Sequence, residues 1–373
     1  MVLIDLRCPE WKFFHHSVYT SFIMIDFRSD TVTRPSAAMR KAMAEAEVGD
    51  DVLREDPTLI ALQKKAAELT GKEAALFTPS GTFANQLSLF TWVNTGGEVY
   101  LNEVSHIIQH EAGASAHISG AFLRPFVPEF FNWAQWSDIA PRIRPEPDQH
   151  FPVPSLICLE NALSDGTVQP VESMAEIKRG AEAAELPVHL DGARLFNAAV
   201  SLGVEASEIA GKVDSVMFCL SKGLGAPVGS LLCGPKDFIE KAFYKRKIMG
   251  GGMRQAGILA AAGLVALEQE LPRLGEDHQM ARELAKAFSA LEAFEVLTPE
   301  PDINMVFLKL HSPGTRVEAG FLTLLEEAGI LTYPAEGGVF RFVTHRDISK
   351  DQLHHTLKVL PQIAEQLAVE DER

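Results

Sequence analysis

Apolar residues along this chain gather in short runs that alternate with stretches of helical spacing. Leucine and alanine recur every three or four residues between Asp56 and Gly71, and an Asp-Pro pair opens this pattern while a glycine closes it. These are the start and stop signals of a helix. An apolar run at 74–77, a turn at 78–82 and a second helical pattern at 83–90 come next. This order predicts a strand, a tight turn and a helix.

Further apolar runs have the length of strands, and they lie at 156–159, 188–190, 213–220 and 229–232. Stretches long enough for a helix, such as 171–185, separate most of them. Short, wholly apolar strands that alternate with helices predict a mostly parallel sheet that is covered on both faces. The predicted fold class is therefore α/β.

The pattern changes near residue 271. From there to the C-terminus, amphipathic helices alternate with strands at 305–310 and 339–343, which is typical of a smaller α+β domain. We therefore expect a large domain over 24–270 and a small C-terminal domain over 271–373.

Two segments lie outside this regular pattern. Residues 1–23 are more mixed than the rest of the chain, so we expect an N-terminal extension that is either poorly ordered or upstream of a natural start at Met24. The stretch 122–154 is rich in proline and aromatic residues and has no clear period. Irregular structure near the surface is expected there.

Composition narrows the class of protein. With 373 residues, 46% of them apolar and 23% charged, the chain has the balance of a soluble globular protein, and its longest apolar stretch, 256–267, is shorter than the roughly 20 residues that span a bilayer. A formal charge of −16 opposes binding to a nucleic-acid backbone. Four scattered cysteines without a CxxC pair favour reduced thiols, a cytoplasmic location and no metal site. We expect no membrane or nucleic-acid partner.

Polar residues directly after apolar runs are the candidates for chemistry, because a doubly wound sheet binds ligands beyond the carboxyl ends of its strands. Ser80, Gly81 and Thr82 stand where a strand meets a helix, and the N–H groups, hydroxyls and helix dipole there suit a phosphate. A simple capped turn is the alternative. Asp191 follows the run at 188–190 and needs a cationic or hydrogen-bonding partner if it is buried there. An ordinary Asp-Gly turn would explain it as well.

Lys222 ends a later apolar run and precedes a glycine-rich segment. Most lysines are solvated surface charges, but a desolvated lysine at a strand end can act as an amine nucleophile towards carbonyls. A phosphate cup, a strand-end carboxylate and such a lysine are the three anchors of a pyridoxal phosphate site. The carboxylate keeps the pyridine nitrogen protonated, and the lysine binds the cofactor covalently. The combination is more specific than any of its parts.

Longer stretches of the chain resemble the low-specificity L-threonine aldolases, within the β-eliminating lyase group of fold-type I pyridoxal phosphate enzymes. The resemblance extends from Met24 to the C-terminus through motifs at 25–33, 48–52, 80–82, 189–194, 220–230 and 250–255. It implies the fold-type I architecture and a homo-oligomer, a dimer or tetramer, with shared active sites. It also implies cleavage of L-threonine, L-allo-threonine and related β-hydroxy-α-amino acids to glycine and an aldehyde.

The resemblance carries roles to individual residues. It places Lys222 at the lysine that binds the cofactor, Asp191 at the partner of the pyridine nitrogen, and Gly81 with Thr82 in the phosphate cup. His106 falls on the histidine that stacks on the cofactor ring, although the residue taken alone would be interpreted as a half-buried histidine.

Three residues match the group that holds the substrate carboxylate, namely Ser29, Arg194 and Arg341, and Arg194 is expected to border the cofactor too. Arg341 has independent support, because it shares a strand face with two valines and would need an anionic partner there. Lys247 and Arg254 match positions that reach a neighbouring subunit's phosphate. Without the resemblance, Lys247 would be interpreted as part of a solvated basic face.

The substrate end of the site departs from the family. His150 lines up with a histidine that recognises the substrate hydroxyl and helps to take its proton, and a water is the alternative base. Ala162-Leu163 stands where the family usually has Thr-His, and Leu53-Arg54 where it has Tyr-Gly. These changes keep two alternatives open. One is β-elimination, or action on a bulkier amino acid; the other is a non-catalytic relative that binds cofactor without turnover.

Overall fold

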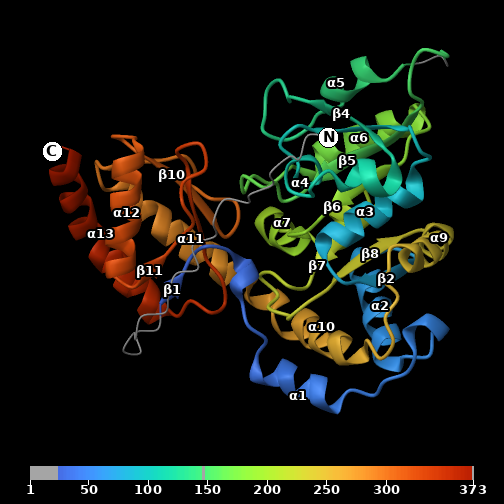
Figure 1. Ribbon diagram of the computed structural model, residues 1–373, viewed down its shortest axis with the longest axis horizontal. Coiled ribbons are helices and arrows are strands. Elements are labelled where there is room, and N and C mark those ends of the chain that lie inside the picture. Colours follow the sequence, from blue (N-terminus) through green and yellow to red (C-terminus); the bar gives the residue numbers. More distant parts are fainter. Residues whose placement is uncertain (1–23, 145–147, 372–373) are drawn as a thin grey trace, which may run out of the picture.

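The computed structural model describes residues 24–144 and 148–371. The predicted extension at 1–23 lies outside the described residues. The chain forms two units side by side, an α/β unit around a seven-stranded sheet and a C-terminal α+β unit, drawn in orange and red, around a three-stranded sheet (Figure 1). The predicted α/β class is confirmed.

The large sheet has the strand order β2-β8-β7-β6-β5-β3-β4. Its strands are β2 (Ala74–Thr78), β3 (Glu98–Asn102), β4 (Phe122–Phe126), β5 (Pro154–Glu160), β6 (Val188–Asp191), β7 (Ser215–Cys219) and β8 (Ser230–Gly234). Neighbouring strands from β7 through β6, β5 and β3 to β4 are parallel, whereas β8 pairs antiparallel with both β7 and β2. The sheet is therefore mostly parallel, as the apolar runs predict.

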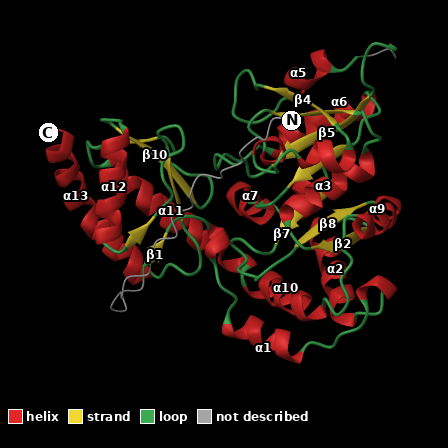
Figure 2. Ribbon diagram, viewed as in Figure 1, coloured by secondary structure: helices red, strands yellow, loops and turns green. Residues whose placement is uncertain are grey.

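Helices cover both faces of this sheet (Figure 2). The helices of the large unit are α1 (Ala37–Glu45), α2 (Pro57–Thr70), α3 (Gly81–Trp92), α4 (His106–Gln109), α5 (Trp136–Ile139), α6 (Val171–Ala183), α7 (Leu195–Leu202), α8 (Ala206–Ala210), α9 (Lys236–Ile248) and α10 (Gly257–Gln269). Leu76 and Met217 pack on one face with residues of α3 and α9, whereas Phe77 and Phe218 belong to the larger core on the other face. Burial on both faces explains why these strands lack an alternation of apolar and polar residues.

The prediction of irregular structure over 122–154 is wrong at the start of this stretch, which forms β4. Among the described strands, β4 pairs only with β3, and it contains Pro125. Proline lacks the N–H group that a central strand needs, but an edge strand tolerates it. The proline and the absence of a period hid this strand in the sequence.

The smaller unit has the strand order β12-β10-β9, with β9 (Phe294–Val296), β10 (Met305–Leu310) and β12 (Phe340–Val343). Its helices are α11 (Leu274–Ser289), α12 (Thr315–Glu327) and α13 (Lys350–Asp371). Phenylalanine rings, among them those of Phe288, Phe321 and Phe342, meet in its core. None of the described helices in either unit combines the length and the apolar character that crossing a bilayer requires.

The start of the described chain belongs to the smaller unit in space. Strand β1 (Ile25–Asp26) pairs in parallel with β11 (Ile330–Leu331), and Phe27 packs against Phe342. The chain then crosses to the large unit. The expected domain boundary after residue 270 falls in a short 3-10 turn, Leu271–Arg273, between α10 and α11.

Asp56 ties two helices of the large unit together. Its Oδ1 accepts the N–H of Leu59 at 3.0 Å as the N-cap of α2, and its Oδ2 accepts the N–H of Gly257, the first residue of α10, at 2.7 Å. A Cβ on Gly257 would lie 2.4 Å from Oδ1, so only glycine allows this approach. The predicted cap of α2 is thus confirmed and also anchors α10.

We expect Asp56→Ala to lower the free energy of unfolding by about 2–4 kcal/mol, because it removes a helix cap and leaves a buried N–H group without a partner. Urea unfolding followed by circular dichroism would measure this. Ser36→Ala is the matched control, since it removes only the cap of α1 and should cost about 1 kcal/mol. Equal losses in the two variants would contradict the second role of Asp56.

Candidate active site

Polar side chains follow four parallel strands where their carboxyl ends meet at one edge of the sheet. His106 begins α4 after β3, Glu160 ends β5, Asp191 ends β6 and Lys222 follows β7. All four line one cavity of about 130 Å³. This is the position at which sheets of this kind bind ligands. Three of these four residues are candidates already in the sequence.

Gly81 and Thr82 close one end of this cavity at the N-terminus of α3. Ser80 precedes them as the N-cap, and its Oγ accepts the N–H of Phe83 at 3.1 Å. A Cβ on Gly81 would lie 2.8 Å from the Sγ of Cys219, so glycine is needed for α3 to start this close to β7. The first N–H groups of the helix and its dipole favour an anion. The sequence left open whether this turn is a helix cap or an anion-binding site, and in the structure the start of α3 combines both.

Asp191 is a buried carboxylate that forms no ion pair with a cation in the described part of the chain. Its Oδ1 accepts the N–H of Ala193 at 3.0 Å, and its Oδ2 accepts the Nδ2 proton of Asn85 at 2.7 Å. These neutral donors stabilise the charge, and a carboxylate has lone pairs left for a further donor from the cavity. Asp191 can therefore hold a protonated nitrogen of a ligand.

Lys222 offers a free amine to the same cavity. Its carbonyl oxygen accepts bonds from the Oγ1 of Thr33 at 2.9 Å and the N–H of Gly225 at 2.8 Å, which fix the backbone. Its Nζ has no hydrogen-bond or ion-pair partner within residues 24–144 and 148–371. A fixed backbone and an unengaged amine suit covalent bonding to a carbonyl group.

Arg194 also lines the cavity, and Asp30 holds it in place. The Nε and Nη2 atoms of Arg194 donate to the two carboxylate oxygens of Asp30 at 2.9 and 2.6 Å. Burial alone would raise the pKa of Asp30, but the guanidinium outweighs burial and lowers that pKa to about 2. Ser29 lies beside this pair, and its Oγ accepts the N–H of Thr31, which lines the cavity.

Arg341 approaches the site from the smaller unit. It lies on β12 opposite Phe307 of β10, and its guanidinium forms no hydrogen bond or ion pair with another residue in the described part of the chain. Burial, and then the positive charge of Arg194, lower the pKa of Arg341. A largely desolvated cation without an ion-pair partner is costly, so this position favours an anionic ligand.

Six predicted residues do not line the cavity within one chain. Ser29, Ser80 and Arg341 lie near it, as described above, and the other three do not. His150 is exposed in a turn before β5, at the amino end of that strand, whereas the cavity is at the carboxyl ends. Lys247 and Arg254 are also exposed, and the Nη1 of Arg254 lies 2.7 Å from the Oδ2 of Asp50.

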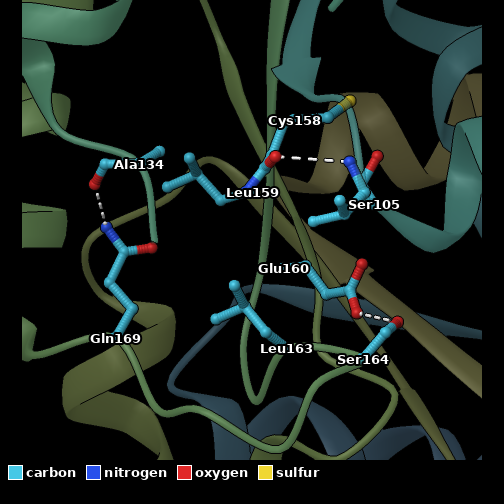
Figure 3. A pocket seen from close by; sticks show the side chains of 10 residues that line it. Ser105, Ala134, Cys158, Leu159, Glu160, Leu163, Ser164 and Gln169 are labelled. Carbon is cyan, nitrogen blue, oxygen red and sulfur yellow. Dashed lines mark hydrogen bonds between the residues drawn. The ribbon is translucent and has the colours of Figure 1, made fainter. Parts of the chain in front are cut away.

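Glu160 is a site residue that the sequence analysis did not single out. Its Oε1 accepts the hydroxyl proton of Ser164 at 2.5 Å, and its Oε2 accepts the N–H of His106 at 2.8 Å. Figure 3 shows the bond to Ser164 beside Leu163, in a small adjoining cavity of about 20 Å³. Burial, and then the charge of Asp191, raise the pKa of Glu160 to about 7. The sequence did contain a signal for Glu160, because this residue directly follows an apolar run just as Asp191 does.

Four further site residues were not singled out in the sequence. Ser221 lines the cavity and directly follows the apolar run at 213–220, so it carried the strand-end signal. Thr31 lines the cavity, Asn85 contacts Asp191 from α3, and Glu111 lies 3.0 Å from the Nδ1 of His106. The positions of these three residues depend on packing between distant segments, which periodicity does not reveal.

Comparison with known proteins identifies the class. The beta-eliminating lyase family matches residues 26–311, and this chain belongs to that family. Its relatives include low-specificity L-threonine aldolase 1 of Arabidopsis thaliana, which is 43% identical over 343 residues, 91% of this chain and 96% of that protein. The low specificity L-threonine aldolase of Escherichia coli strain K12 is 43% identical over 330 residues, 88% of this chain and 96% of that protein. The resemblance found in the sequence is confirmed.

Solved structures show the same fold. The threonine aldolase of Leishmania major superposes with a TM-score of 0.79 at 20% identity, and the match covers 91% of this chain and 99% of that one. Serine palmitoyltransferase of Sphingomonas wittichii gives a TM-score of 0.74 at 16% identity, with 93% and 88% covered. The predicted fold-type I architecture is confirmed.

We expect Asp30→Asn to lower the free energy of unfolding by about 3–5 kcal/mol, because Arg194 would stay buried without a counter-charge. A lowered carboxyl pKa stabilises the fold above the unfolded value of 3.8, and this stabilisation is lost as pH falls towards about 2. Wild-type protein should therefore lose roughly 1 kcal/mol more between pH 5 and pH 3 than Asp30→Asn. Urea unfolding at both pH values would measure this, and identical pH dependence would contradict it.

Proposed function

We propose that this protein is a pyridoxal phosphate-dependent lyase that cleaves L-threonine, L-allo-threonine and related β-hydroxy-α-amino acids to glycine and an aldehyde. The observation that carries the proposal is one cavity that combines the anion-binding start of α3, the buried carboxylate of Asp191 and the free amine of Lys222. The names of the relatives from Arabidopsis thaliana and Escherichia coli support the choice of reaction.

The chemistry of the cavity walls fits pyridoxal phosphate. The N–H groups of Gly81 and Thr82, with the hydroxyls of Thr82 and Ser221, would hold the phosphate, and Lys222 would bind through its Nζ. Asp191 would face the pyridine nitrogen, and His106 would stack on the ring. When bound, pyridoxal phosphate supplies an electron sink for the carbanion at the substrate Cα.

The substrate carboxylate would lie between the two units. Asp30 already neutralises Arg194, so Arg341 supplies the uncompensated positive charge. Ser29 would support this group through Thr31. Fixing the carboxylate orients the bonds at Cα and so selects the one that breaks.

Among the described residues that line the cavity, Glu160 is well placed to take the role expected of His150. The Glu111 carboxylate raises the pKa of His106, so this ring keeps its proton to higher pH than a free histidine. Glu160, with its pKa near 7, is better suited to accept the proton of the substrate β-hydroxyl. As that O–H bond breaks, the carbonyl of the aldehyde forms, the Cα–Cβ bond breaks, and its electron pair stays with Cα.

The assembly is proposed to be a homo-oligomer, a tetramer of two dimers with shared sites. Lys247 and Arg254 are exposed, which leaves both side chains accessible to a neighbouring subunit's phosphate. A cytoplasmic location is supported by the free thiols of the buried Cys158, Cys219 and Cys233.

A second candidate is β-elimination, or cleavage of an amino acid with a larger β-substituent. Ala162 lines the main cavity, and Leu163 lines the small cavity beside it. These apolar side chains replace the polar pair of the family at the end that would face the substrate side chain. An apolar wall suits a larger or less polar β-substituent.

We expect the purified protein with pyridoxal phosphate to release glycine and an aldehyde from L-threonine or L-allo-threonine. A panel that adds L-phenylserine and L-serine, with assays for glycine, aldehyde and keto acid, would rank the substrates. Lys222→Ala should reduce turnover at least a thousandfold, because the amine that binds the cofactor is lost (roughly 10³ or more for a covalent catalytic group). Keto acid and ammonia as products would instead favour β-elimination.

Arg341→Ala should raise KM for the amino acid by roughly ten- to a hundredfold, because an ionic hydrogen bond to the carboxylate is lost. Steady-state kinetics on the preferred substrate would measure the change. Arg282→Ala is the control, since it removes an exposed arginine of α11 in the same unit. An unchanged KM in Arg341→Ala would rule out its contact with the carboxylate.

A further inference from the structure

Asn85 lines the cavity and lies between two buried carboxylates. Its Nδ2 lies 2.7 Å from the Oδ2 of Asp191 and 2.9 Å from the Oε1 of Glu111. Asn85 is 1% exposed, and the two acidic residues are 2% exposed. Ionised carboxylates only accept hydrogen bonds, so the two protons of this amide nitrogen serve one carboxylate each.

The contact of the side-chain oxygen of Asn85 agrees with this orientation of the amide. The Oδ1 of Asn85 can only accept, and it lies 3.3 Å from the Nε2 of His189, which therefore carries the proton. Burial lowers the pKa of His189 to about 4, so the ring is neutral and its Nδ1 accepts from the Oγ of Ser215 at 2.9 Å. The Nε1–H of Trp92 donates to that same Oγ at 2.8 Å. Every donor along this path has an acceptor.

Glu111 extends this hydrogen-bond network to the ring of His106. Its Oε1 lies 3.0 Å from the Nδ1 of His106, which must hold a proton to donate to it. Its Oε2 accepts the Nε2 proton of Gln86 at 2.5 Å. The carboxylate thus fixes the plane of His106 and the nitrogen that is protonated.

The amide of Asn85 lies between two like charges. One side-chain atom each of His106, Glu111 and Asp191 lies within 4.8 Å of the others. Two buried carboxylates this close repel each other unless a donor or a cation lies between them. The amide nitrogen of Asn85 donates to both carboxylates and so offsets part of this repulsion.

We propose that Asn85 is a positioning residue that couples Asp191 to His106 through Glu111, and so fixes how both side chains face the cavity. The inference rests on the proposed function, in which these two groups contact the pyridine nitrogen and the ring face of pyridoxal phosphate. Loss of the amide would leave two adjacent buried carboxylates without the donor that lies between them. The site would then bind the cofactor less tightly, and the bound cofactor would titrate differently.

Asn85→Ala tests this, with Gln86→Ala as the matched control. Gln86 is the next residue of α3, is equally buried, and donates to Glu111 but not to Asp191. We expect Asn85→Ala to weaken pyridoxal phosphate binding by roughly ten- to a hundredfold and to shift the pH midpoint of the visible absorption band of the holoenzyme. Gln86→Ala should change the dissociation constant less than about twofold and leave the midpoint in place. Equal behaviour of the two variants would overturn the inference.

Glu111→Gln provides a second test that preserves the shape of the site. The Oε1 of Gln86 is buried without a partner among the described residues and could accept the new amide proton, so this variant should fold. Glu111→Gln alone should shift the pH midpoint of the visible absorption band of the holoenzyme. In a protein that already carries Asn85→Ala, the same change should affect cofactor affinity much less than it does in the wild-type protein. Additive effects, or an unshifted midpoint in Glu111→Gln, would overturn the coupling.

These readouts are separate from the reaction. If the wild-type holoenzyme released no glycine from any β-hydroxy-α-amino acid, the proposed function would fail, and the binding and absorbance measurements would still decide the role of Asn85. If wild-type protein cleaved L-threonine while Asn85→Ala matched Gln86→Ala, the function would stand and the inference would fall.

Discussion

The buried ion pair of Asp30 and Arg194 connects the two units at the place where the site forms, and the arrangement of the cavity depends on it. Asp30 follows strand β1, which pairs with the smaller unit, whereas Arg194 directly precedes helix α7 of the large unit. Thr33, in the same segment, donates to the carbonyl oxygens of Asp30 and Lys222. The pair thus forms the wall beside the reactive amine, and Arg341 stays free to bind an anionic ligand.

Four ionisable groups lie close together at this edge of the sheet, and their surroundings differ. Neutral donors hold Asp191, a carboxylate holds Arg194, and burial raises the pKa of Glu160. The amine of Lys222 stays unengaged within the described chain. Because the compensation lies within the protein, the groups that face the cavity are arranged for a ligand and not for one another.

The cofactor end and the substrate end of the cavity are formed by different kinds of structural element. The cofactor end uses strand ends and a helix start, whose positions the sheet fixes. The substrate end uses a loop, at Ala162-Leu163, and the smaller unit, at Arg341. Changes in the loop can therefore alter the preferred side chain while the cofactor end keeps its geometry.

Local signals in the sequence determined the helix at 57–70, the apolar strands of the large sheet, and the strand-end positions of Asp191 and Lys222. These features follow from periodicity, capping and burial on both faces, which act over a few residues. Tertiary structure alone decided that Asn85 lies between two carboxylates and that Asp30 neutralises Arg194. Both relations come from contacts between segments far apart in the chain, and no local pattern of residues encodes which distant partner will satisfy a buried charge.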